Sequence, residues 1–117
     1  MAAPNIVNVA TITGKTAVQA VGTSATAIVT NSAASGKVFK INALYVSNVD
    51  GTANAEITVD LFRSSVAYKI ANTVVVPADA SLDVISKSIY LEEGDTLRLT
   101  ANATGDLEAV CSYEEIS

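Results

Sequence analysis

Apolar and polar residues alternate with a period of two along most of this chain. The clearest case is AEITVDLF, residues 55–62. Ala55, Ile57, Val59 and Leu61 share one face, and the polar residues Glu56, Thr58 and Asp60 share the other. Successive side chains of a β-strand point to opposite faces, so this segment is predicted to be a half-buried strand. No window of useful length repeats apolar residues at the helical positions i, i+3, i+4 and i+7.

Turn residues divide this pattern into roughly eight to nine predicted strands at a spacing near ten residues. The predicted strands cover residues 5–13, 16–21, 24–30, 37–49 and 55–62, a run from 66 that Pro77 ends, 82–85 with 88–91, 96–101 and 107–113. Gly14 is expected to end the first, and Asp50-Gly51 to join two antiparallel neighbours as a hairpin. The pattern predicts an all-β, antiparallel β-sandwich in one domain, residues 1–117, with jelly-roll and Ig-like strand orders both open.

The longest predicted strand, residues 37–49, carries apolar side chains on both faces. Such a strand contacts a second layer of the protein or a neighbouring subunit. A tyrosine can bury its ring at an interface and keep its hydroxyl in water. The candidates for a subunit or partner interface are therefore Val38, Leu44, Val46 and Tyr113.

Charge restricts the partners of the chain. Seven basic residues stand against twelve acidic ones, which gives a net charge of −5. Too few cations are present for a basic stripe, which argues against nucleic acid and against anionic membranes as partners. The N-terminus has no basic start and no apolar run typical of a signal peptide, and no segment reaches the ~20 apolar residues that cross a bilayer.

The residue types exclude most catalytic and cofactor chemistry. The chain has no histidine and one cysteine, Cys111, so Ser-His-Asp and Cys-His triads, zinc sites and internal disulfides cannot be built. The acids Glu92, Glu93 and Asp95 remain as weak candidates for a calcium site or for acid–base chemistry. We favour a tight turn in which Gly94 supplies a positive φ and the acids are solvated. No enzyme activity and no cofactor are expected.

Three segments resemble a known class of proteins. They are MAAPNIVNVATITGKT, GKVFKINALYVSNVDGTANAEITVDL and ADASLDVISKSIYLEEGDTLRLTANATGDLEAVCSYEEIS. Together they resemble small virion structural proteins of tailed bacteriophages, especially those of the marine and cyanophage type. The resemblance covers most of the chain and is strongest in VSNVDGT and in the acidic segment from Ile89 onward.

This resemblance implies a non-enzymatic virion protein, made in the cytoplasm of a bacterial host and assembled without disulfides. A capsid decoration or cement protein that self-associates is the leading expectation, because the acidic C-terminal third suits the exterior of a capsid. A component of the tail, neck or fibre is the alternative within this class. A receptor- or glycan-binding module is an alternative of another class, although the loops NSAASGK and NATGD lack aromatic residues. Symmetric binding positions favour a homo-oligomer, with a trimer as first expectation.

Overall fold

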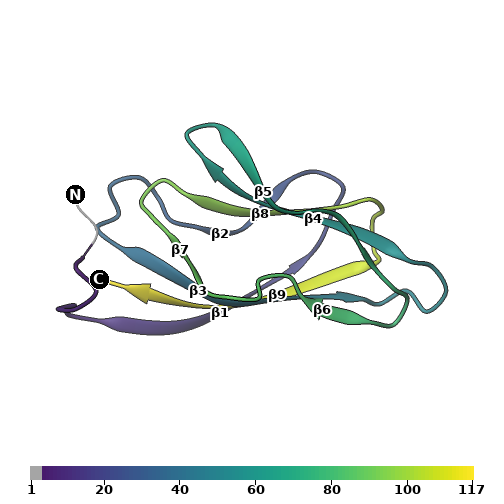
Figure 1. The fold of residues 1–117 in the computed structure, drawn as a ribbon, viewed down its shortest axis with the longest axis horizontal. Coiled ribbons are helices and arrows are strands. Elements are labelled where there is room, and N and C mark those ends of the chain that lie inside the picture. Colours follow the sequence, from purple (N-terminus) through teal and green to yellow (C-terminus); the bar gives the residue numbers. More distant parts are fainter. Residues whose placement is uncertain (1–3) are drawn as a thin grey trace.

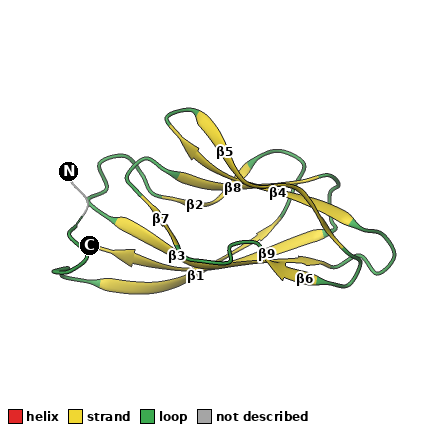
Figure 2. Cartoon of the chain, in the orientation of Figure 1, coloured by secondary structure: helices red, strands yellow, loops and turns green. Residues whose placement is uncertain are grey.

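The computed structural model describes residues 4–117, and all regular secondary structure in this part of the chain is β-strand (Figure 2). The strands are β1 (Ile12–Ala20), β2 (Thr26–Thr30), β3 (Val38–Asn48), β4 (Ala55–Arg63), β5 (Val66–Val76), β6 (Ser81–Asp83), β7 (Ile89–Leu91), β8 (Thr96–Ala101) and β9 (Leu107–Ile116). The prediction of an all-β fold with eight to nine strands is confirmed. None of the described residues forms a helix long and apolar enough to cross a membrane.

The strands form two antiparallel sheets that lie over one another as two layers (Figure 1). Sheet 1 has the order β1-β9-β3-β6, and β7 also pairs with β3. Sheet 2 has the order β2-β8-β4-β5. Consecutive strands mostly alternate between the two sheets. The last strand, β9, lies between β1 and β3 in sheet 1.

The core is a layer of aliphatic side chains between the sheets. Its fully buried members come from both layers, and the largest include Ile41, Leu44, Ile57, Leu91, Leu97, Leu99 and Leu107. Burial of each such side chain contributes about 1.5–3 kcal/mol relative to exposure. Aromatic rings are nearly absent from this layer, and Phe39 contacts Tyr113 near its end with ring centroids 5.7 Å apart.

A β-bulge in β3 explains why its sequence is apolar at both odd and even positions. The register with β9 shifts between Ile41 and Ala43. Before the shift Phe39 and Ile41 are buried, and after it the buried residues are Leu44 and Val46. One extra residue in a strand reverses the side on which all later side chains emerge. The apolar residues that the sequence assigned to two faces of this strand therefore lie mostly on one face, which contacts sheet 2.

The N-terminal strand begins later than predicted. Residues 5–11 form no strand, and β1 starts at Ile12 and continues through Gly14. Asn5 forms a turn instead, because its Oδ1 accepts the N–H of Val7 at 3.0 Å and its carbonyl accepts the N–H of Asn8 at 3.0 Å. Asparagine side chains compete in this way with strand pairing. Gly14 does not interrupt β1, since β9 pairs with it throughout.

The predicted hairpin at Asp50-Gly51 is also wrong, because β3 lies in sheet 1 and β4 in sheet 2. The segment is an arch between the layers, organised by the buried side chain of Asn48. Its Nδ2 donates to the carbonyls of Ala53 and Val76, both at 2.9 Å, and its Oδ1 accepts the N–H of Asp50. The amide thus supplies polar partners that a neighbouring strand would supply in a hairpin.

The hairpin that does form joins β4 to β5 through Ser64-Ser65. Arg63 pairs with Val66, and the two serines between them have φ angles of 52° and 61°. Two positive φ values define a type I′ turn, which matches the twist of the strands and favours Asn-Gly. Serine in this conformation is strained by about 1–2 kcal/mol.

Replacement of Ser65 by glycine relieves this strain. We expect Ser65→Gly to raise the free energy of unfolding by about 1 kcal/mol in urea titrations. Ser112→Gly, in the middle of β9, is the control and should lower it by about 0.5–1 kcal/mol, because glycine weakens a regular strand. A loss of stability in Ser65→Gly contradicts the strain assigned to this turn.

Candidate functional site

The acidic segment between β7 and β8 is the first candidate site, and its backbone is the expected turn. The N–H of Asp95 donates to the carbonyl of Glu92 at 3.0 Å, and Gly94 has a φ of 90°. A positive φ at the third position is the signature of a type II turn. The side chains differ from expectation, since Asp95 is only 1% exposed rather than solvated.

Asp95 is held by Arg63, which ends β4 in sheet 2. Arg63 Nε lies 2.7 Å from Oδ1 and Nη2 lies 2.6 Å from Oδ2, and the N–H of Glu92 donates to Oδ2 at 2.8 Å. Burial raises the pKa of Asp95, but the hydrogen bonds from Arg63 and Glu92 and the Arg63 charge outweigh burial, so the pKa is lowered from its usual value. The pair fastens the β7–β8 turn to the β4–β5 hairpin.

The other two acids, Glu93 and Glu92, make different contacts. Glu93 Oε2 accepts the N–H of Gly36 at 3.0 Å, which ties the turn to the loop before β3. Glu92 Oε2 lies 2.9 Å from Arg63 Nη2, at an exposed position. Among the described residues no three acidic, cysteine or histidine side chains gather so that they could hold a metal ion. We interpret Glu92, Glu93 and Asp95 as structural groups.

Removal of the Arg63 guanidinium leaves a buried, unpaired carboxylate. We expect Arg63→Met to lower the free energy of unfolding at pH 7 by about 1–2 kcal/mol, a range discounted for the partial exposure of Arg63. Ionised Asp95 stabilises the fold above its unfolded pKa of about 3.9, and this stabilisation is lost as the pH falls through the lower folded pKa. The difference between wild type and variant should therefore shrink below about pH 4.

Lys87→Met, in an exposed loop, is the control and should change stability little. Thermal unfolding with calcium and with a chelator completes the test, because a structural role predicts the same melting temperature in both. A calcium-dependent rise in melting temperature that is lost in Asp95→Ala contradicts the structural interpretation.

Cys111 is the second group with potential reactivity, and it lies in the core. Its side chain is fully buried in β9, between the register partners Ala17 of β1 and Leu44 of β3. Burial raises the pKa of the thiol to about 11. The reactive thiolate is therefore nearly absent at neutral pH.

We expect Cys111 to resist Ellman's reagent in the native protein at pH 8 and to react within minutes in guanidinium chloride. The physical reason is burial of an uncharged thiol. Fast labelling of the native protein would contradict the placement of Cys111 in the core. A Cys111→Ala variant is the control for background colour.

The structure places the four interface candidates in different environments. Leu44 and Val46 are fully buried against sheet 2, and the ring of Tyr113 contacts Phe39. Val38, 7% exposed, faces outward, where Pro4 and Ile6 lie beside it. Packing inside a single chain accounts for the apolar character of Leu44 and Val46. Leu44 and Val46 are therefore not accessible to a partner in this fold, whereas Val38 and Tyr113 stay predictions.

The outer face of sheet 1 carries exposed apolar side chains. Val18 of β1 pairs with Val110 of β9, which pairs in turn with Tyr45 of β3, so the three side chains lie in one row across the strands. Their exposed fractions are 74%, 40% and 50%. We call these three residues the apolar row. The sequence contained a signal for it, because Val110 is an apolar residue at an outward position of a strand whose inward positions are also apolar.

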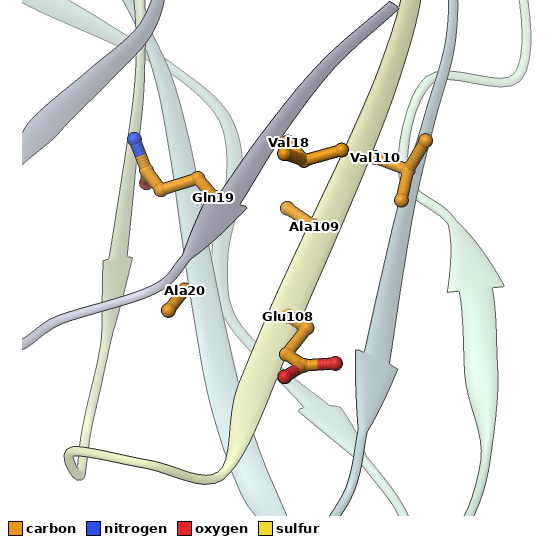
Figure 3. Close-up of a pocket in the computed structure, with 6 residues that line it drawn as sticks. All are labelled: Val18, Gln19, Ala20, Glu108, Ala109 and Val110. Atoms are coloured by element: carbon orange, nitrogen blue, oxygen red, sulfur yellow. The ribbon is translucent and has the colours of Figure 1, made fainter.

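A shallow hollow of about 340 Å³ lies beside this row, over β1 and β9 (Figure 3). Its lining consists of Val18, Gln19, Ala20, Glu108, Ala109 and Val110. Glu108 is the one ionisable residue among the six, so the hollow brings together no acid–base pair or nucleophile with its base.

Comparison with known proteins concerns the fold. No protein family model and no curated protein matches the sequence. Among solved structures, a chain from the Bacillus endospore appendages, described as a novel family of disulfide-linked pili, is 17% identical. The similarity covers 92% of this chain and 88% of that one, with a TM-score of 0.55.

A second solved structure is a pentameric capsid protein isolated from metagenomic phage sequences. It is also 17% identical, with a TM-score of 0.44, and the similarity covers 86% of this chain and 60% of that one. At these identities only the shared β architecture of the endospore appendage chain is informative.

Proposed function

We propose that this protein is a non-enzymatic structural subunit of a bacteriophage virion, most specifically a capsid decoration or cement protein that self-associates. The observation that carries the proposal is the apolar row of Val18, Val110 and Tyr45 on the outer face of sheet 1. Exposed apolar side chains that lie together mark surfaces that contact other proteins. The partners would be virion proteins and further copies of the chain.

Three further observations support the proposal. The sequence resembles small virion proteins, and its fold is shared with a subunit of an assembled appendage. The facing strand orders β1-β9-β3-β6 and β2-β8-β4-β5 support the jelly-roll alternative over the Ig-like one. Asp95 and Cys111, the two groups with potential reactivity, are both buried, and Asp95 is hydrogen-bonded to Arg63. Disulfide linkage is not part of the proposal, because Cys111 is buried.

A glycan-binding module is the second candidate, and exposed tyrosines favour it. Tyr45, Tyr68 and Tyr90 are 50%, 56% and 41% exposed. Tyr68 lies on β5 of sheet 2, whereas the other two lie on sheet 1, so the three do not form one stacking platform. A glycan array with the purified protein tests this candidate, and binding to a defined sugar would favour it over a structural role.

The proposal predicts that the protein is a stoichiometric component of purified virions. Mass spectrometry of virions should detect it, and immunogold electron microscopy should place the label on the head. Val18→Asp should reduce incorporation at least tenfold by placing a charge in the apolar row. Val7→Asp, at a valine that is 89% exposed outside that row, is the matched control and should be incorporated normally. Absence of the protein from virions contradicts the proposal. Immunogold label confined to the tail or neck contradicts a role in capsid decoration and supports the alternative location.

A further inference from the structure

We propose that two copies of the chain pair through antiparallel β1 strands, with a two-fold axis at Thr16, so that their first sheets become one continuous sheet. The inference names the contact by which the subunit of the proposed function self-associates, and in that respect it rests on that function. It is carried by the strand edges, the directions of the backbone groups and the register that they allow.

The first step is a comparison of the edge strands. A strand edge exposes unpaired N–H and C=O groups, and monomeric proteins protect it by short strands, bulges, prolines or charges. Strand β2 has five residues and a bulge, and β6 and β7 have three residues each. Strand β5 is long, but its pairing is shifted twice and Thr73 adopts a φ of 51°. Strand β1 has nine residues paired to β9 without a shift.

The charge pattern of β1 does not protect this edge either. Lys15 is its one charged residue, and its Nζ lies 2.9 Å from Glu115 Oε2. Strand alternation places Lys15 on the same side as Ala17, which packs against the core. The outward positions Ile12, Gly14, Thr16, Val18 and Ala20 are uncharged.

The second step is the direction of the backbone groups of β1. Thr11 and Ser117 exchange both of their N–H···O=C bonds at 2.9 Å, and the N–H of Val21 donates to the carbonyl of Leu107 at 2.9 Å. In an antiparallel pair, residues bonded to the neighbour alternate with residues whose groups point away. Odd-numbered residues of β1 therefore bond to β9. The groups of Ile12, Gly14, Thr16, Val18 and Ala20 point away from it.

The third step is the register. A two-fold axis at Thr16 places this residue opposite Thr16 of the partner subunit, Gly14 opposite the partner's Val18 and Ile12 opposite the partner's Ala20. All five outward residues of each copy then face an outward residue of the other and can exchange both hydrogen bonds. Larger side chains lie opposite smaller ones, and no charges face each other. The space above Gly14 is open, since a Cβ built there meets nothing within 4 Å.

One buried polar atom lies close to this edge and has no partner within the described part of the chain. Gln19 Oε1 is the one buried side-chain oxygen or nitrogen without a hydrogen-bond partner among the described residues. Its Nε2 donates to the carbonyl of Ala27 at 2.8 Å, which fixes the amide. The proposed register places Thr13 of the partner subunit opposite Gln19, on the same side of the sheet. A threonine hydroxyl can donate to an amide oxygen, but this oxygen is enclosed by the chain's own atoms, so the contact requires the Gln19 side chain to turn toward the edge.

A second copy fits this edge better than an unrelated strand, because the edge is complementary to itself. An axis at Gly14 or at Val18 would leave the outward N–H and C=O groups at one end of β1 without a partner strand. A two-fold contact also closes after two copies, so it forms a pair rather than a fibre. The pair has twice the 12.0 kDa chain mass, whereas the trimer expected from the sequence has three times that mass.

A charge-swap experiment tests the pairing. Thr16→Glu places two carboxylates opposite each other at the axis, and Thr16→Lys places two ammonium groups there. We expect each variant alone to dimerise at least about tenfold more weakly than wild type, and an equimolar mixture to form a heterodimer, because like charges directly opposed are destabilising and opposite charges are not. Sedimentation equilibrium and native mass spectrometry measure the masses.

Matched controls separate β1 from other contacts. Thr73→Glu puts the same charge on the β5 edge and should leave the pair intact. Thr16→Pro removes an outward N–H without breaking a bond to β9, so it should fold and weaken the pair. Ala17→Pro, whose N–H bonds to β9, should destabilise the fold itself. Circular dichroism checks the folding of each variant.

Amide hydrogen exchange gives a residue-level readout. In the pair, the amides of Gly14, Thr16 and Val18 should exchange as slowly as those of Lys15 and Ala17. In folded Thr16→Glu the even-numbered amides should become fast while the odd-numbered ones stay slow. Fast exchange of the even-numbered amides in the wild type would overturn the pairing, as would a wild-type monomer or a pair lost in Thr73→Glu but kept in Thr16→Glu.

The inference and the proposed function fail separately. A charge-swap heterodimer together with absence of the protein from virions would keep the pairing and overturn the virion role. Virion incorporation of a protein whose mass does not respond to Thr16→Glu would keep the role and overturn the pairing.

Discussion

The structure depends on one requirement, that polar groups removed from water must find partners where strands end between two apolar layers. Two buried asparagines meet it at the ends of the sandwich. Asn31 donates to the carbonyls of Lys37 and Leu91 at 2.9 and 3.0 Å and accepts the hydroxyl of Ser35 at 2.6 Å. Asn48 does the same for the arch that leads from sheet 1 to sheet 2. Without these amides the layer-crossing connections would contain buried, unpaired backbone groups.

The same requirement explains how two buried acids of the chain are held. Asp95 is ionised in a buried place only because Arg63 and a backbone N–H hold it. Asp60 is also buried and is held by Arg98, which in turn lies 4.0 Å above the ring of Phe62. Charges used in this way stabilise one arrangement of hairpins and turns and are not free for a substrate.

The requirement does not extend to the exposed edge of strand β1. Its outward N–H and C=O groups can bond to water, so a monomer is permitted, but water competes poorly with a strand of matching register. The apolar row extends onto the same strand through Val18. A pair formed at this edge would bring the rows of two copies onto one continuous outer face, which a virion surface could contact.

The sequence by itself determined the strand content, because alternation is local. The strands at residues 38–48, 55–63 and 96–101 lie close to their predicted places, and the Glu92–Asp95 turn needed only Gly94. The sheet that each strand joins could not be read from the local sequence. Asp50-Gly51 is a strong hairpin signal, yet the buried amide of Asn48 and the burial of β4 in sheet 2 made it an arch. The bulge in β3 reversed the faces of Leu44 and Val46, which moved them from a proposed interface into the core. Only the tertiary structure decided which strand is left as a regular, unguarded edge, because an edge is defined by the neighbour that a strand lacks and not by its own residues.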